Sequence, residues 1–546
     1  MKRLSLILVL LSTVSLTAQT VIVAPATPAA RLVQSLIAGG SADLQNVYGP
    51  AAYALLWSRG GRPTAQAQAV IAVLENASAK GLQPTDYDAG QWSTRIANLR
   101  ADADVARFDV ALTAAVMHYA SDVRSGRVHP QEVDFAMETE AKSVYLPAIA
   151  VQTATSTDPA AFLAGLEPRH DEYRRLLTAL ADYRRLESEA KNDTPLPVVA
   201  KLAPGQTYAA LPQLATKLRR LGDLPVDLGD LPADAKFEST QYTGAIVDAV
   251  KHFQTRHGLE GDGVIGKTTF AQLNTPVSRR VQQIEWALER WRWMPEQLDE
   301  QTILVNIPEF RLRARDAQTG EELTMRVVVG KANGHQTPVF GGDIKHVVFR
   351  PYWSVPPAIQ RNEIAPKLER DGNYLARNNF ELVDDAGRSF GSGVDADTLR
   401  RVKNGSLQVR QKPGGANALG LVKFLFPNDN NVYLHSTPQQ ALFARARRDF
   451  SHGCIRVEDP VALATWALRD DAAWTRKKIE AAMKGEQNDV YVKVSRPINV
   501  LIVYATAAVT TDGQVNFFED IYGHDTQLAK VLEPEHRGAG VLLAAK

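Results

Sequence analysis

The sequence predicts an α+β protein of several domains, with a helical N-terminal region, a small helical module and a β-rich C-terminal domain. Its 546 residues exceed what one hydrophobic core usually organises, and 45% hydrophobic content is typical of folded domains. Residues 30–190 show helical periodicity without strand-like alternation. From Thr302 onwards, short β-branched and aromatic runs alternate with Gly, Asn, Asp and Pro, which indicates strands.

The first residues have the form of a secretory signal peptide, which we place at residues 1–18. The segment "MKRLSLILVLLSTVSLTAQT" has two basic residues, an apolar run and then small and polar residues. We therefore expect an exported protein, with an uncleaved membrane anchor as the alternative. The formal net charge of +1 provides no overall field that would attract nucleic acid, so no nucleic-acid partner is expected.

Helical segments follow in order. Residues 30–190 form the first helical domain, and residues 207–275 form a smaller one. Residues 276–300 are predicted to form a bridging helix that ends near Pro295. Apolar residues at helical spacing predict the buried faces of the first domain's last helix and of the bridging helix. These residues are Tyr173, Leu176, Leu180 and Tyr183, then Val281, Ile284, Leu288 and Trp291.

The β-rich domain is placed at residues 301–496, with a C-terminal extension over residues 497–546. Within it, residues 360–416 are irregular and rich in Asn, Asp and Gly, which favours an insertion over the sheet.

One motif suggests a nucleotide site. "GDGVIGKT" at Gly261–Thr268 fits the phosphate-binding pattern G-x-x-x-x-G-K-[ST]. Such a loop requires a buried strand before it and a helix after it. The preceding segment "AIVDAVKHFQTRHG" has helical character, so we expect a turn between helices instead.

Cys454 is the only cysteine of the chain and has three interpretations. A free cysteine is often a small buried hydrophobic residue. A metal site would combine Cys454 with His452 and His435, but structural zinc prefers paired Cys or His spacings. A nucleophile needs a base and donors for a developing oxyanion, and the polar surroundings "FSHGCIRV" favour this interpretation.

The remaining parts of such a site are present in "YLHSTP" and "SHGC". His435 can act as the base, and Ser436 or its carbonyl can orient the ring. Gly453 allows close approach of a carbonyl, so that backbone N–H groups near Cys454 form an oxyanion hole, with the Tyr433 hydroxyl as a further donor.

These two segments closely resemble the catalytic motif of the L,D-transpeptidases, in which a His near a strand end precedes S-H-G-C-x-R. The resemblance implies Cys454 as nucleophile, His435 as base, and His452 and Arg456 as supporting residues. Segments such as "ALTAAVMHYASDVRSGRVHP" resemble the scaffold domain of the large Gram-negative members. Residues 207–275, with "DGVIGKTT", resemble the three-helix peptidoglycan-binding domain. The insertion at residues 360–416 corresponds to a lid.

The resemblance also implies a periplasmic enzyme that forms 3→3 cross-links between peptidoglycan stem peptides without a metal or organic cofactor. Peptidoglycan stem peptides and glycan are the expected partners, cell-wall synthases are further candidates, and β-lactams of the carbapenem type are expected inhibitors. An L,D-carboxypeptidase, a wall-protein attachment enzyme and a non-catalytic wall-binding scaffold are the alternatives.

Four other side chains have open roles. His452 is either structural or catalytic. Arg456 either binds a substrate carboxylate or pairs with an acidic residue such as Glu458. Trp353 either lines the substrate cleft or belongs to the core. His335, like His346, is expected to be an ordinary surface or strand residue.

Overall fold

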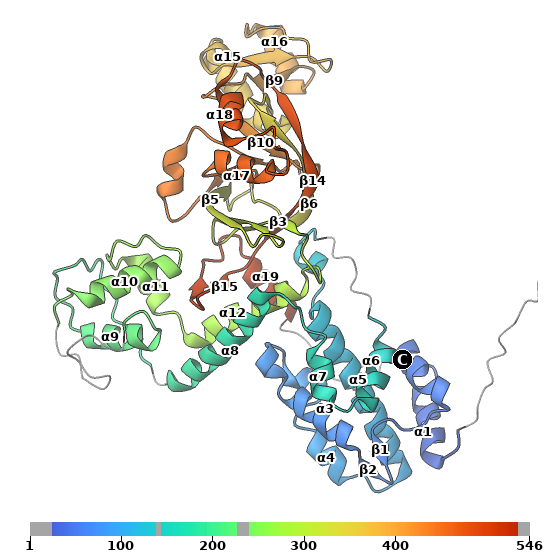
Figure 1. The fold of residues 1–546 in the computed structure, drawn as a ribbon. Helices are drawn as coiled ribbons and strands as arrows, with labels where there is room; N and C mark the ends of the chain where they lie inside the picture. Colours follow the sequence, from blue (N-terminus) through green and yellow to red (C-terminus); the bar gives the residue numbers. More distant parts are fainter. Residues whose placement is uncertain (1–24, 138–143, 192, 226–239, 533–546) are drawn as a thin grey trace, which may run out of the picture.

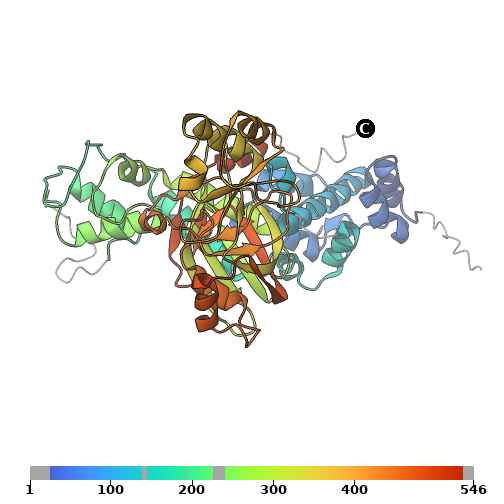
Figure 2. The same ribbon diagram turned by 90° about the horizontal axis from the view of Figure 1, so that it is seen from above.

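The structure is a computed structural model that describes residues 25–137, 144–191, 193–225 and 240–532. The signal peptide expected at residues 1–18 lies outside these ranges. The chain forms a helical lobe, a small helical domain and a β domain, which meet around two packed helices (Figure 1). Viewed from above, the β domain lies between the two helical parts (Figure 2). No helix in the described ranges is both long and apolar enough to span a membrane.

The N-terminal lobe is built around the long helix α5. Its helices are α1 Pro28–Ile37, α2 Ala42–Tyr48, α3 Ala65–Glu75, α4 Trp92–Ala97, α5 Asp102–Ser125, α6 Leu146–Thr155 and α7 Pro159–Ala164. The buried carboxylate of Asp109 on α5 accepts hydrogen bonds from the backbone N–H groups of Leu56 and Trp57, and each bond has a length of 2.8 Å. Burial raises the pKa of Asp109 to about 6. This buried carboxylate fixes the connection after α2 against the central helix.

The expectation of a purely helical region is wrong in one detail. Strands β1 Ser58–Arg59 and β2 Arg62–Pro63 form a short antiparallel hairpin. Gly60 and Gly61 connect them with φ of +57° and +73°, which is the backbone conformation that two-residue hairpin turns require.

Helices α8 Asp171–Glu189 and α12 Val277–Arg292 pack against each other where the helical lobe, the small helical domain and the β domain meet (Figure 1). The predicted apolar faces of both helices are confirmed as buried. They belong to one hydrophobic core with the sheet of the β domain. Helix α8, which we grouped with the first helical domain, is therefore part of the joint that supports the β domain.

The small helical domain consists of α9 Leu211–Arg220, α10 Ala245–Arg256 and α11 Lys267–Leu273. The segment Gly261–Thr268 leads from α10 to α11, so the helix-to-helix turn expected there is confirmed. Gly263 has φ of +76°, and its carbonyl accepts a 2.6 Å hydrogen bond from the Tyr242 hydroxyl. Without a preceding strand, this turn lacks the architecture of a phosphate-binding loop.

The β domain contains a nine-stranded mixed sheet in the order β12-β5-β13-β11-β10-β6-β14-β3-β4. Strand β5 also pairs with β4, which closes the sheet into a ring. The strands are β3 Gln301–Asn306, β4 Arg311–Asp316, β5 Glu322–Gly330, β6 Phe340–Phe349, β10 Val422–Leu425, β11 Leu434–His435, β12 Asp449–Ser451, β13 Ile455–Val457 and β14 Val490–Val503. Helices α17 Pro460–Ala467 and α18 Arg476–Lys484 follow β13.

The boundary expected between residues 496 and 497 falls inside β14 and is corrected by the structure. Residues Asn499–Val503 pair in parallel with Thr302–Asn306 of β3. The pairing of β14 with β6 shifts register between Lys493 and Ile498, and Pro497 lies in this irregular stretch. A proline that interrupts a ladder resembles a strand end in a sequence, although the strand continues. Beyond β14 follow β15 Ala507–Val509, β16 Val515–Phe517 and α19 His524–Leu532.

The insertion forms a small subdomain with its own hydrophobic core between β6 and β10. It contains α13 Pro357–Ile359, the single π-helical turn η5 Gln360–Ile364, α14 Ala365–Arg370, α15 Tyr374–Arg377 and α16 Ala396–Asn404. Its sheet has the order β7-β9-β8, with β7 Trp353–Ser354, β8 Phe380–Val383 and β9 Gln408–Gln411. The subdomain starts before residue 360 because β7 belongs to this sheet. It stands at the end of the β domain far from the helical lobes (Figure 1).

Candidate functional site

Strand register gathers the candidate residues on one face of the sheet. Strands β11 and β13 are parallel, and Leu434 lies opposite Ile455 while His435 lies opposite Arg456. Because side chains alternate along a strand, His435 and Arg456 project on the face opposite to the fully buried Leu434 and Ile455. Cys454 directly precedes β13, and its thiol lies close enough to Tyr433, Lys423 and Arg456 for these three side chains to influence it.

Cys454 is half-buried at the turn between β12 and β13. Its Sγ lies 3.7 Å from the carbonyl oxygen of Asn431. Desolvation raises the pKa of the Cys454 thiol, although hydrogen bonds from the backbone and hydroxyl of Tyr433 and the charges of Lys423 and Arg456 act in the opposite direction. The resting sulfur is consequently a protonated thiol at neutral pH, with groups already in place that favour the thiolate.

His435 is buried, with 4% of its surface exposed. Its Nδ1 is hydrogen-bonded to the Ser436 carbonyl, which can only accept, so Nδ1 carries the proton of the neutral ring. Burial, followed by the nearby charge of Arg456, lowers the pKa of His435 to about 3. At neutral pH the ring is therefore uncharged. Among the described residues, no direct hydrogen bond joins the His435 ring to Sγ; such bonds often form only once a substrate is bound.

Ser436 is held in place by close backbone packing. Its N–H donates to the Val422 carbonyl over 2.9 Å. A Cβ at Gly420 would lie 2.4 Å from Ser436 Oγ, and Gly420 has φ of +62°. Only glycine fits there without displacing the carbonyl that orients His435.

Hydrogen bonds hold both the backbone N–H and the carbonyl of Gly453. Its N–H donates to Ser451 Oγ over 3.1 Å, and its carbonyl accepts a 2.7 Å hydrogen bond from Thr337 Oγ1. With φ of +114°, the position favours glycine. The Gly453 N–H is thus engaged within the protein, which leaves the oxyanion role to other donors near Cys454.

Comparisons with known proteins identify the domains of the chain. Residues 300–492 match the family described as "L,D-transpeptidase catalytic domain". Residues 300–492 therefore belong to the L,D-transpeptidase catalytic domain family. Residues 42–180 match the family described as "Scaffold domain", and residues 208–273 match the "Putative peptidoglycan binding domain".

A Haemophilus influenzae protein named "Putative L,D-transpeptidase" is 32% identical over 231 residues, which are 41% of this chain and 45% of the relative. The matched region thus spans less than half of the relative's length. A crystal structure of an L,D-transpeptidase from Stackebrandtia nassauensis matches 57% of this chain and 97% of its own, with 13% identity and a TM-score of 0.22.

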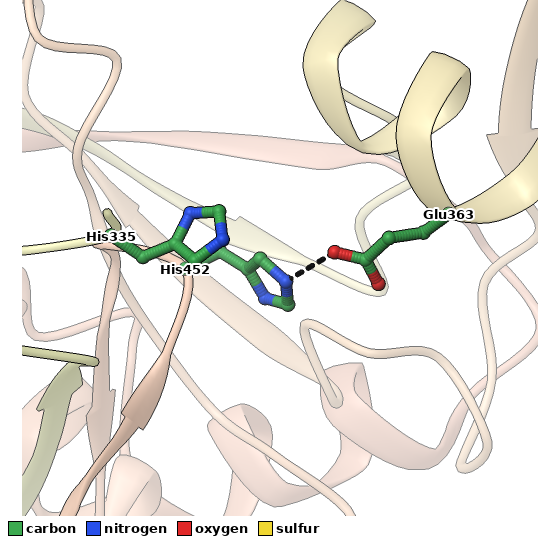
Figure 3. Close-up of side chains that lie close together, drawn as sticks. All are labelled: His335, Glu363 and His452. Carbon is green, nitrogen blue, oxygen red and sulfur yellow. Dashed lines mark hydrogen bonds and ion pairs between the residues drawn. The ribbon is translucent and has the colours of Figure 1, made fainter. Parts of the chain in front are cut away.

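In this L,D-transpeptidase domain, His452 is directed towards the insertion. Its Nε2 lies 2.6 Å from Glu363 Oε1 on η5 (Figure 3). The ring also packs edge-on against His335, with 4.6 Å between ring centroids. His335 lies half-buried in the loop between β5 and β6 and contacts His452 through its ring.

The Arg456–Glu458 ion pair considered from the sequence is not formed. Glu458 instead accepts a 2.9 Å hydrogen bond from Arg326 Nε. Arg456 donates from Nη1 to Gln439 Oε1 over 2.6 Å, while its Nε is buried without a partner among the described residues. A buried N–H without a partner is costly, so the Nε of Arg456 is an unsatisfied donor beside the site.

Trp353 connects the insertion to the surroundings of Cys454. It lies on β7, half-buried, beside the insertion's core. A hydrogen bond from Trp353 lowers the pKa of Tyr433, although burial and the nearby Cys454 raise it well above its ordinary value overall. Tyr433 thus bridges Trp353 and the sulfur.

Lys423 and Thr337 were not identified from the sequence. Lys423 lies opposite His435 on β10, with its Nζ 3.8 Å from the centroid of the Tyr433 ring. Thr337 is completely buried and holds Gly453 from the loop after β5. The alternation in "GLVKFLF" signals a strand face for Lys423, but only the strand order brings it to His435.

Proposed function

We propose that the chain is a peptidoglycan L,D-transpeptidase that forms 3→3 cross-links through an acyl-enzyme on Cys454. The observation that carries the proposal is the common sheet face of His435 and Arg456 beside Cys454, inside a domain that matches the catalytic domain of the family. The matches to a scaffold and a peptidoglycan-binding domain support the same substrate and a site of action at the cell wall or in the periplasm.

In the first half-reaction, the Cys454 thiol transfers its proton to Nε2 of neutral His435 as Sγ attacks a carbonyl carbon. This carbonyl belongs to the peptide bond between the third residue of a stem peptide, diaminopimelate, and D-alanine at position four. Collapse of the tetrahedral intermediate breaks the C–N bond, and His435 returns the proton to the leaving D-alanine amine.

In the second half-reaction, the side-chain amine of another stem attacks the thioester carbonyl. It loses a proton to His435, and the proton returns to Sγ as the thiol leaves. No redox step and no organic cofactor is needed for this balance.

Two nearby cations suit the proposed chemistry. Lys423 and Arg456 both lower the pKa of the Cys454 thiol and so stabilise the developing thiolate. They also lower the pKa of His435, which keeps the ring available as a base. For the oxyanion, the backbone N–H of Cys454 and the Tyr433 hydroxyl are the proposed donors, since Gly453 N–H is bonded to Ser451.

The remaining candidate residues receive supporting roles. The Ser436 carbonyl orients the base, and Gly453 shapes the turn that presents the sulfur. His452 is assigned a structural role, because its Nε2 is bonded to Glu363. Arg456 is proposed to bind a stem-peptide carboxylate with its guanidinium, and Trp353 to position Tyr433 at the edge of the cleft.

The test incubates the purified chain with disaccharide-tetrapeptide and follows products by mass spectrometry. Release of D-alanine with a dimer supports transpeptidation, whereas release without a dimer indicates a carboxypeptidase. Transfer to a supplied protein amine would indicate wall-protein attachment, and binding without any product would indicate a scaffold. If Cys454→Ala releases D-alanine at the wild-type rate, the assigned nucleophile is wrong. Carbapenem acylation would add its mass to the single cysteine of the wild-type chain only.

A further inference from the structure

A cluster of three metal-ligand side chains lies beside the nucleophile but outside the proposed reaction. His335, Glu363 and His452 each present one ligand atom, and these atoms lie within 4.8 Å of one another. Figure 3 shows the His452 ring beside the ring of His335 and joined by its hydrogen bond to the Glu363 carboxylate. The three residues come from three separate segments: the loop between β5 and β6, the insertion, and the turn that holds Cys454.

The two histidines are positioned by backbone interactions that do not involve their rings. Thr337 Oγ1 bonds both the Gly330 N–H, over 2.9 Å, and the Gly453 carbonyl, which ties the His335 loop to the His452 turn. The Tyr522 hydroxyl donates to the Gly330 carbonyl over 2.6 Å and accepts from the Thr337 N–H over 3.2 Å. Both imidazoles are therefore brought together by the fold itself.

The carboxylate is held by the insertion. Glu363 belongs to the same short helical turn as Gln360, whose side-chain amide donates to the carbonyls of Val402 and Leu407 over 2.8 Å each. The neighbouring Ile364 is buried in the core of the insertion. The backbone of Glu363 is therefore fixed within the insertion.

Two imidazoles and one carboxylate form a ligand set for Zn²⁺ and related first-row divalent metals, whereas Ca²⁺ and Mg²⁺ prefer oxygen ligands. Bonds of about 2.0–2.2 Å from zinc to nitrogen and oxygen would require only small side-chain rotations from the observed separations. The 2.6 Å contact between His452 and Glu363 already brings two of the ligand atoms closer than they would be around the ion.

We propose that His335, Glu363 and His452 bind a Zn²⁺-type ion that fastens the insertion to the turn carrying Cys454. Three protein ligands leave a fourth position for water. The metal would replace the His452–Glu363 hydrogen bond with coordination by both groups, and so hold the insertion against the β domain. This site is independent of the chemistry on Cys454.

The test uses the full chain with Cys454→Ala, so that no thiol can bind the metal. Zn²⁺ alone is titrated by calorimetry, with Mg²⁺ as the control, and Co²⁺ is followed by its visible spectrum. We expect one Zn²⁺ per chain and no comparable Mg²⁺ binding. Adding His335→Ala or Glu363→Gln should weaken Zn²⁺ binding at least tenfold. Glu363→Gln keeps an acceptor for His452, and His346→Ala on β6 is the matched control that should bind like the parent.

Hydrogen exchange measures the fastening directly. In the Cys454→Ala chain, Zn²⁺ should slow exchange in peptides covering residues 357–370, and His335→Ala should abolish this protection. Unchanged affinity in both ligand variants would overturn the site. Tight Zn²⁺ binding without protection of the insertion would overturn the fastening. Neither outcome depends on D-alanine release, so the proposal fails or stands separately from the proposed enzyme activity.

Discussion

Arg456 lies directly opposite His435 on the neighbouring parallel strands β13 and β11. After burial, the charge of Arg456 is the largest influence that lowers the pKa of the His435 ring. Charge on one strand thus keeps the proposed base on the next strand neutral.

The acid limb of the pH profile should therefore lie far below the ordinary pKa of histidine. With a pKa of about 3, His435 stays unprotonated as pH falls through 6.5, so kcat/KM for D-alanine release should be nearly unchanged between pH 7 and pH 5. An acid limb centred near pH 6.5 would contradict the assignment of a buried neutral His435 as base.

Replacing the opposing charge should move this limb upwards. Arg456→Gln removes a positive charge beside His435, which raises the pKa of the ring, so the ratio of activity at low pH to activity at pH 7 should be smaller in the variant than in the wild type. The comparison of the two pH values within one variant separates this effect from weaker substrate binding. Arg326→Gln on β5, which pairs with Glu458, is the control and should keep the wild-type profile.

Tyr433→Phe should slow reactions of the thiol. The hydroxyl of Tyr433 lowers the pKa of Cys454, and a hydrogen bond to a charged group contributes about 1.5–3 kcal/mol, or roughly ten- to a hundredfold. Alkylation by iodoacetamide can be followed by intact mass, because the chain has one cysteine. The pH at which the alkylation rate increases should be higher in the variant than in the wild type. Tyr491→Phe, whose ring is exposed on β14, should react like the wild type.

Gly330→Ala should disrupt the loop that supports Gly453. A Cβ at this position would lie 1.9 Å from the His335 carbonyl oxygen and 2.8 Å from the Thr337 nitrogen. We expect a loss of about 1–3 kcal/mol or more in the stability of the β domain, with loss of D-alanine release. Gly266→Ala has open space and φ of −97°, so it should leave both unchanged. If Gly330→Ala has the melting temperature and activity of the wild type, the predicted clash in this loop is wrong.

Arg256→Ala should destabilise the small helical domain. Arg256 pairs with Asp223, whose side chain is fully buried, and its Nη1 also donates to the Val515 carbonyl over 3.2 Å. Removing one partner of a buried pair costs about 3–5 kcal/mol because the other charge stays buried. Lys251→Ala breaks an exposed pair with Asp248 and should cost less than about 1 kcal/mol. Thermal unfolding of the two variants should differ clearly; equal transitions would refute a structural role for the buried pair.

The sequence predicted the parts of the molecule that depend on local pattern. Helical spacing identified the buried residues of α8 and α12, and β-branched and aromatic runs indicated the β-rich domain from Thr302 onwards. Pairing between distant strands is not encoded in local spacing, so the position of Lys423 beside His435 was not predictable. The same holds for Glu363, which reaches His452 from 89 residues away. The domain boundary expected after residue 496 was wrong because Pro497 interrupts the pairing of β14 with β6 without ending the strand.

The insertion leaves the sheet after Phe349 and returns at Val422, and these two residues pair directly on β6 and β10. Its two ends are therefore neighbours, and the strands on either side keep their register whatever lies between them. Such an attachment allows segments of different length or sequence to be exchanged while Cys454 and His435 stay in place. Grafting a different segment between Phe349 and Val422 should accordingly leave the pairing of β6 with β10 intact.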